Sequence, residues 1–75
     1  MNNLREYINP KELKITYLNN KLNIVNFDKI VILTDNKIIL LKDKKSITIT
    51  GTCLTLLKLM DFEILIGGEI KTINL

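Results

Sequence analysis

Hydrophobic and polar residues alternate along several short stretches of this chain. The clearest stretches are residues 13–17, 22–24, 47–50 and 54–56, in which every second residue is Leu, Ile or Tyr. Such alternation gives a β-strand one apolar and one polar face. Clusters of Asn, Asp, Gly or Lys separate the stretches at a spacing of roughly eight residues, which is typical of short antiparallel strands joined by turns. The pattern predicts an all-β fold, a small antiparallel β-sandwich or roll of hairpin-connected strands, with a short β-solenoid as the alternative.

Residues 30–41 form a hairpin that is apolar on both faces if Asp35–Asn36 is a two-residue turn. The pairs expected across the strands are Leu33–Ile38 and Val31–Leu40 on one face, and Ile32–Ile39 and Ile30–Leu41 on the other. A chain of 75 residues has little material with which to cover both faces. We therefore expect one face to fill the core and the other to be an interaction surface, buried by another copy or by a partner. The residues of this expected surface are Ile30, Ile32, Ile39 and Leu41.

Glycines predict the remaining turns. A two-residue turn at Gly51–Thr52 would form a one-sided hairpin with the pairs Ile49–Leu54 and Ile47–Leu56. At the second site, a three-residue loop at 67–69 with a glycine bulge would bring Ile66 opposite Ile70. That bend would also let the last strand change sheets.

The first residues follow a different pattern. Residues 1–12 are expected to be an N-terminal lead to a single domain that spans residues 1–75. Asn2 or Asn3 could cap a single helical turn that ends before Pro10 and packs Leu4 and Ile8 against the sheet. No apolar run approaches the roughly 20 residues of a membrane-spanning helix.

The composition excludes most catalytic chemistry. The chain has no His and a single Cys, which rules out His-based acid–base catalysis, Cys–His nucleophiles and His/Cys zinc sites. The carboxylates are dispersed over expected turns, and the closest pair, Asp61 and Glu63, flanks Phe62 at a strand boundary. We interpret Cys53 as a small packing residue. The sequence thus predicts no catalytic, cofactor-binding or metal-binding residues, no small-molecule substrate, and a protein that is not an enzyme.

The charge is mildly basic, with a net charge of +3 and a pI of about 9.1. Arg5 is the sole arginine and the lysines are scattered, which disfavours nucleic acid as a partner, although a small β-barrel that binds nucleic acid remains the alternative function. The densest cluster, residues 42–45, is expected to be a solvated hairpin loop. One Cys cannot form an internal disulfide and no signal peptide is recognisable, so we expect a reducing, cytoplasmic environment.

The order of these motifs resembles a known family. The most specific parts are Ile47-x-Ile49-x-Gly51-x-x-Leu54-x-Leu56 and Glu63-Ile64-x-Ile66-x-Gly68-x-Ile70, preceded by Ile15-Thr16, the run Leu22-Asn23-Ile24-Val25-Asn26, and Ile38. Together they resemble the YabP/YqfC family of sporulation proteins over residues 13–75.

The resemblance carries its own expectations. It implies a small all-β protein of endospore formation, without enzymatic activity or cofactor, that acts in spore envelope or coat assembly through protein–protein contacts. It also implies a place in the mother-cell cytoplasm near the forespore and a membrane-embedded sporulation protein as a partner. Self-association is expected independently of the resemblance, because so short a chain buries little surface of its own. It supplies no catalytic residues.

Overall fold

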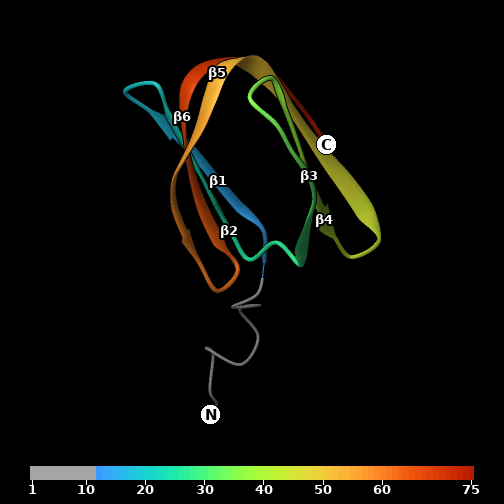
Figure 1. Cartoon of the computed structure of the whole chain (residues 1–75). Helices are drawn as coiled ribbons and strands as arrows, with labels where there is room; N and C mark the ends of the chain where they lie inside the picture. The colour runs from blue at the N-terminus through green and yellow to red at the C-terminus, as the bar shows by residue number, and fades with distance from the viewer. Residues whose placement is uncertain (1–11) are drawn as a thin grey trace.

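The computed structural model describes residues 12–75, which form a single antiparallel sheet of six strands in the order β1-β2-β6-β5-β4-β3 (Figure 1). The strands are β1 (Lys14–Leu18), β2 (Lys21–Val25), β3 (Lys29–Leu33), β4 (Lys37–Lys42), β5 (Lys45–Met60) and β6 (Glu63–Asn74). The all-β, antiparallel prediction is confirmed, whereas the solenoid alternative is wrong because every strand pairs with antiparallel neighbours. The helical turn expected near the N-terminus lies outside the described residues.

The sheet folds over on itself because β5 and β6 are long enough to run through two layers. The first half of β5 pairs with β4 and with the second half of β6. Its second half pairs with the first half of β6, which also pairs with β2. Figure 1 shows β5 and β6 arching over the top of the molecule, with the other strands on the two legs. One layer therefore consists of β3, β4 and these β5 and β6 segments, and the other consists of β1, β2 and the remaining segments.

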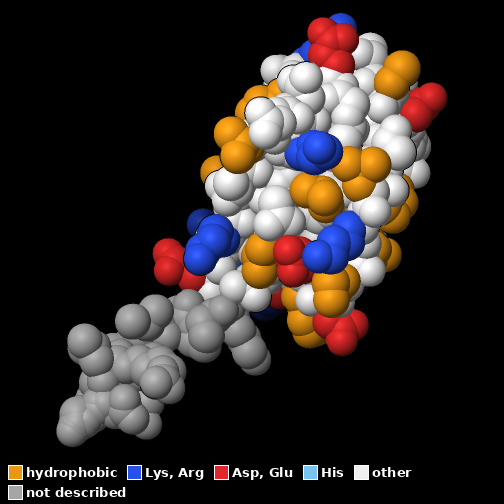
Figure 2. Space-filling model, turned by 90° about the vertical axis from the view of Figure 1, so that its left-hand side faces the viewer, with side chains coloured by type: hydrophobic (Ala, Val, Ile, Leu, Met, Phe, Trp, Pro, Cys, Tyr) orange, Lys and Arg blue, Asp and Glu red, His pale blue; other side chains and the backbone are white. Residues whose placement is uncertain are grey.

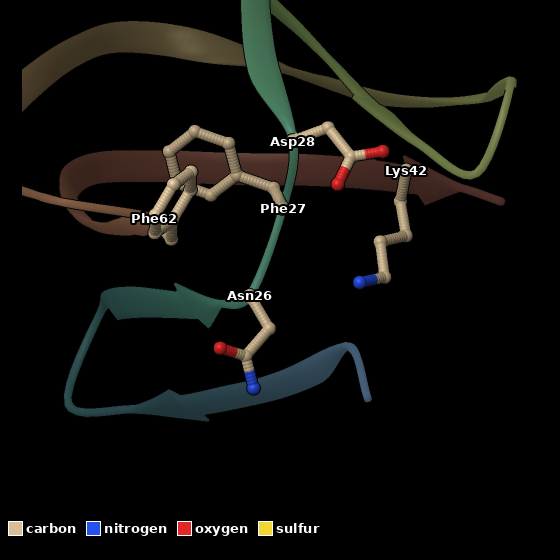
Figure 3. A pocket seen from close by; sticks show the side chains of 5 residues that line it. All are labelled: Asn26, Phe27, Asp28, Lys42 and Phe62. Carbon is tan, nitrogen blue, oxygen red and sulfur yellow. The ribbon is translucent and has the colours of Figure 1, made fainter. Parts of the chain in front are cut away.

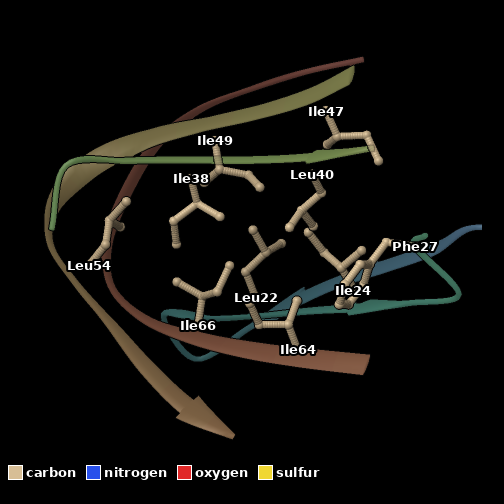
Figure 4. Close-up of a cluster of buried hydrophobic side chains, with 10 residues drawn as sticks. All are labelled: Leu22, Ile24, Phe27, Ile38, Leu40, Ile47, Ile49, Leu54, Ile64 and Ile66. Atoms are coloured by element: carbon tan, nitrogen blue, oxygen red, sulfur yellow. The ribbon is translucent and has the colours of Figure 1, made fainter. Parts of the chain in front are cut away.

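Aliphatic side chains from both layers fill the space between them (Figure 4). The buried residues are Leu22, Ile24, Phe27, Ile38, Leu40, Ile47, Ile49, Leu54, Ile64 and Ile66. They alternate with more exposed neighbours along β2, β4 and the first half of β5, as a one-sided strand requires. Each fully buried Leu or Ile contributes about 1.5 to 3 kcal/mol, so this cluster is the main source of stability in the described part of the chain.

The predicted turn at Gly51–Thr52 is wrong, because β5 continues through both residues. Ile49 pairs with Ile38 and Ile73 instead of Leu54. Gly51 lies where β5 bends, and a Cβ there would overlap the carbonyl oxygen of Glu69 on β6. The glycine is needed for the close approach of two strands at the bend rather than for a turn.

The predicted loop at 67–69 is also wrong, because β6 is continuous there and Ile66 pairs with Leu22 and Leu56. Gly68 has a φ of 109°, which favours glycine, at the corresponding bend of β6. Irregularities in the β5–β6 register accompany the two bends. The last part of the chain changes layers after the glycines, as expected, but it does so within the single strand β6.

Two-residue turns join the hairpins elsewhere. Asn19 and Asn20 have φ values of 55° and 59°, and Asp43 and Lys44 have values of 52° and 67°, as type I′ turns require. The charged cluster at 42–45 is therefore a hairpin turn, as predicted. The β5–β6 turn consists of Asp61 and Phe62, between the paired residues Met60 and Glu63.

The β1–β2 and β3–β4 hairpins have similar sequences and similar positions. Both contain Lys-Ile-x-x-Leu in the first strand, at 14–18 and 29–33, and Asn-Lys at the start of the second, at 20–21 and 36–37. The tip of β3–β4 meets the bend of β5, where the carbonyl oxygens of Asp35 and Asn36 accept hydrogen bonds from the N–H groups of Leu54 (2.7 Å) and Gly51 (3.1 Å). The tip of β1–β2 lies at the bend of β6, where Asn20, Gly68 and Glu69 line one hollow.

Candidate interaction surface

The β3–β4 hairpin carries the residues expected to form an interaction surface. Its turn at Asp35–Asn36 is as predicted, since Thr34 N–H donates to the carbonyl oxygen of Lys37 at 2.9 Å. Leu33 pairs with Ile38 and Ile32 pairs with Ile39, also as predicted. Beyond them a β-bulge leaves Val31 without a direct partner.

The rest of the predicted register is wrong because of this bulge. Ile30 pairs with Leu40 instead of Leu41, and Leu41 pairs with Lys29. Because Leu40 is fully buried, this register turns Ile30 toward the core, against which it packs. Of the four expected surface residues, Ile32, Ile39 and Leu41 share the outer face of the hairpin, and Ile30 belongs to the other face.

Three consecutive apolar residues of β3 are exposed. Val31 is 50%, Ile32 is 39% and Leu33 is 46% exposed. Ile39 and Leu41 beside them are half-buried. We define these five residues as the β3 patch. A run of exposed aliphatic residues on an edge strand is unusual unless it binds something.

A second group of exposed apolar residues lies on the C-terminal half of β5 and its turn, and the sequence prediction did not include it as a surface. We define it as the β5 patch, which consists of Leu56, Leu57, Leu59, Met60 and Phe62. Leu57 lies at a bulge and covers Gly67, where a Cβ would meet the Leu57 side chain. The signal in the sequence was the loss of alternation after Leu56, where apolar residues occupy both faces.

The strands β5 and β6 together form a bent two-stranded ribbon, and both patches are reached from its β5 edge, although they belong to different layers. The tip of the β3–β4 hairpin bonds to the main chain of β5 at its bend, and beyond that bend the same edge of β5 has no strand beside it among residues 12–75. Leu33, Leu56 and Leu59 pair with fully buried residues of the neighbouring strands, so they belong to the core-facing sides of β3 and β5. They are exposed because these strands form the open edges of the two layers.

Lysines border the β3 patch. Lys29 is paired with Leu41, and Lys37 follows the turn on the same outer face as Ile39.

Figure 2 views the molecule from the side on which the C-terminal half of β5 lies, and shows hydrophobic side chains exposed among lysines and acidic residues. Apolar centres with a charged rim are the usual composition of a protein–protein interface.

One hollow, of about 350 Å³, is lined by Asn26, Phe27, Asp28, Lys42 and Phe62 (Figure 3). Its polar groups bond to the surrounding chain. The Asp28 carboxylate accepts the N–H of Asp43 at 2.8 Å, Asn26 Nδ2 donates to the carbonyl oxygen of Glu12 at 2.9 Å, and the Asn26 N–H donates to that of Phe62 at 2.6 Å. These bonds hold the β2–β3 connection against the start of β1 and the two turns beside it, which is a structural role.

The other residues considered for chemistry lie apart. Cys53 is exposed, with a φ of 53° at the β5 bulge, so its interpretation as a packing residue is wrong. Asp61 is part of the exposed β5–β6 turn. Among residues 12–75, no group of three or more His, Cys, Asp or Glu side chains could hold a metal ion. In the same region no helix has the length and apolar character needed to span a membrane.

Comparison with known proteins finds no match: no family model, no curated protein and no solved structure is similar to this chain.

Proposed function

We propose that this protein is a non-enzymatic assembly module that binds a partner protein through the β3 and β5 patches. The distribution of exposed large hydrophobic residues supports the proposal. There are eleven such residues in the described chain; three lie on β3 and five belong to the β5 patch, so eight of the eleven belong to the two patches. Scattered apolar residues need no explanation, whereas a concentration in patches is typical of a binding surface.

The surroundings of the β3 patch suggest the chemistry of the partner. Lys29 and Lys37 would lie at the rim of the interface, where acidic side chains of the partner would complement them. A partner with an apolar centre and an acidic rim therefore fits this surface better than a nucleic acid does, because isolated lysines provide few phosphate contacts.

The resemblance to the YabP/YqfC family gives this proposal a biological setting. In that setting the module acts in the mother-cell cytoplasm during endospore formation, and its partner is a membrane-embedded sporulation protein. The supporting residues are the motifs at 47–56 and 63–70. In the structure these motifs contain Gly51 and Gly68, which lie where β5 and β6 bend from one layer to the other.

The test compares three double variants of the tagged protein in pull-downs from sporulating cells of its own organism. Ile32→Lys with Ile39→Lys disrupts the β3 patch, and Leu57→Lys with Met60→Lys disrupts the β5 patch. Asn74→Lys with Leu75→Lys is the matched control, because both residues are exposed at the C-terminal end of the described chain and belong to neither patch. Melting temperature is measured for each variant.

We expect the wild type and the control to retain the same partner protein, and at least one patch variant to lose it while its fold is preserved. Retention of that partner by both patch variants would contradict the proposal. The proposal would also be contradicted if the wild type recovered nucleic acid at physiological salt and the patch variants altered that binding.

A further inference from the structure

The four open edges of the folded sheet are not equivalent. Among residues 12–75 these edges are β1, β3, the C-terminal half of β5 and the C-terminal half of β6. The β3–β4 ladder and the β5–β6 ladder both contain bulges, including one between Ile30 and Ile32 and one between Leu56 and Lys58. The β1–β2 ladder is regular along all five residue pairs. Bulges discourage an edge strand from pairing with another chain, so β1 is the edge that remains suited to pairing.

The turn after β1 determines which main-chain groups face outward. Asn19 and Asn20 form a two-residue type I′ turn, so its flanking residues Leu18 and Lys21 are a hydrogen-bonded pair. Hydrogen-bonded and non-hydrogen-bonded pairs alternate along an antiparallel ladder. The N–H and C=O groups of Ile15 and Tyr17 are therefore directed away from β2, toward the free edge.

We propose that two copies of this chain pair through β1, antiparallel about a two-fold axis at Thr16. This register places Ile15 of one copy opposite Tyr17 of the other, twice. Both residues carry outward-facing main-chain groups, so the interface gains four hydrogen bonds between the chains. The two Thr16 residues form the non-hydrogen-bonded pair at the centre, where side chains approach most closely.

The side chains favour the same register. Ile15 and Tyr17 pair with the buried Ile24 and Leu22, so they lie on the core-facing side, where they form two pairs of an aromatic and a β-branched residue. On the outer side Thr16 meets Thr16, and Lys14 meets Leu18, which is 67% exposed in the single chain. The aliphatic stem of lysine can cover a leucine while its amine stays in water. No like charges lie opposite one another.

Other registers are less favourable. A shift of one residue would place core-facing side chains opposite outward-facing ones, since successive residues of a strand point to opposite faces. A shift that centres the axis on Ile15 or Tyr17 keeps the faces matched, but two residues at one end of the five-residue strand then have no partner within the other strand. The register about Thr16 is the one that uses every residue of β1. The resulting dimer has one layer that continues across both chains.

The β1 pairing is separate from the partner binding proposed above, because β1 lies beyond the β6 edge of the ribbon and the two patches are reached from its β5 edge. Sedimentation equilibrium of the full chain at submillimolar concentration should therefore give a dimer of the 8.6 kDa chain. The variant with Ile32→Lys and Ile39→Lys should dimerise like the wild type. A failure of the partner-binding proposal would leave this result unchanged.

Thr16→Lys and Thr16→Glu provide the decisive comparison. Each places two like charges at the axis and should weaken dimerisation by up to about fivefold, whereas an equimolar mixture of the two should form a heterodimer. Thr55→Lys, at an exposed position on the free edge of β5, is the matched control and should leave the dimer intact.

Hydrogen exchange provides a measurement without mutation. The amides of Ile15 and Tyr17 should exchange rapidly in the monomer and become protected as the concentration of the wild-type protein rises. A wild type that stays monomeric, a dimer that Thr55→Lys disrupts and Thr16→Lys does not, or amides at 15 and 17 whose exchange is independent of concentration would overturn the β1 pairing.

Discussion

The two adjacent glycines of β6 should differ sharply in their tolerance of alanine. At Gly68 the φ is 109°, and a Cβ would overlap the carbonyl oxygen of Cys53 and lie 2.9 Å from its carbonyl carbon and 3.1 Å from the Cα of Leu54. All of these atoms belong to the main chain of β5. They can move only if the bend of the β5–β6 ribbon changes.

Two effects of Gly68→Ala lower the free energy of unfolding: the strained backbone conformation and the contact with the main chain of β5. A non-glycine residue in a sparsely populated backbone region costs about 1 to 3 kcal/mol, and a ladder hydrogen bond lost by displacing β5 costs about 1 kcal/mol more. We expect the free energy of unfolding to fall by about 3 kcal/mol. For a domain of this size that corresponds to a melting temperature lower by about 12 to 24 °C.

Gly67→Ala is the matched control. Its φ is not in the left-handed region, and a Cβ there would meet the side chain of Leu57, whose Cδ1 lies 2.8 Å away. Leu57 is 48% exposed and can rotate into solvent. The substitution should change stability by no more than about 1 kcal/mol, since the gain from a less flexible unfolded chain offsets part of the contact.

Thermal and urea denaturation, followed by circular dichroism at one protein concentration, measure the difference between these variants. Equal concentration is necessary because dimerisation would raise the apparent stability of every variant. If Gly67→Ala and Gly68→Ala melt within a few degrees of one another, the close approach of β5 and β6 at Gly68 is not what maintains the bend.

Three further substitutions test the local geometry by urea denaturation. Cys53→Gly should raise the free energy of unfolding by about 1 kcal/mol, because Cys53 has a positive φ and is exposed; a loss of stability would show that its side chain contributes packing. Asn20→Gly should raise it by a few tenths of a kcal/mol, because Asn-Gly is the preferred type I′ pair; a decrease would contradict that turn type. Asp28→Ala should lower it by about 1 kcal/mol through loss of the bond from Asp43 N–H, and Asp28→Asn, which keeps an acceptor, should lower it less; equal losses would exclude this bond as the cause.

Alternation was sufficient to predict the strands but not the path of the longest ones. The stretches at 13–17 and 22–24 correspond to β1 and β2, and the turn at Asp35–Asn36 is where the sequence placed it. Gly51 was assigned to a turn because a glycine between two alternating stretches has that appearance locally. The reason for the glycine is instead the carbonyl group of Glu69, a contact between residues distant in the sequence, which periodicity cannot detect.

The candidate surface was predicted in part for a similar reason. Ile32 and Ile39 were placed opposite each other correctly, and Ile30 was assigned to the wrong face because a continuous apolar run hides the change of phase that a bulge introduces. In β5 the change of phase was visible. Apolar residues of the inner face occur at Leu54, Leu56 and then Leu59, and this shift by one residue coincides with the bulge at Leu57.

The similarity of the two hairpins connects the two proposals. β1 and β3 occupy equivalent positions in their hairpins, and the second shared residue of each motif, Ile15 or Ile30, packs against the core. They differ at the residue that follows, which is Thr16 in β1 and the bulged Val31 in β3. A polar residue in a regular strand suits symmetric pairing about a two-fold axis, while an apolar bulge prevents β3 from competing for the same contact.

In the proposed dimer the binding surfaces would have a defined arrangement. Pairing through β1 uses the edge of its layer opposite to the C-terminal half of β5, so the β3 and β5 patches of each chain stay exposed. Two partner molecules bound to such a dimer would be held at a fixed separation, and a partner that is itself clustered would be bound by both chains at once. The second contact is then intramolecular and strengthens binding without any additional interface. Thr16→Lys should therefore weaken binding to a clustered partner and leave binding to a single partner molecule unchanged.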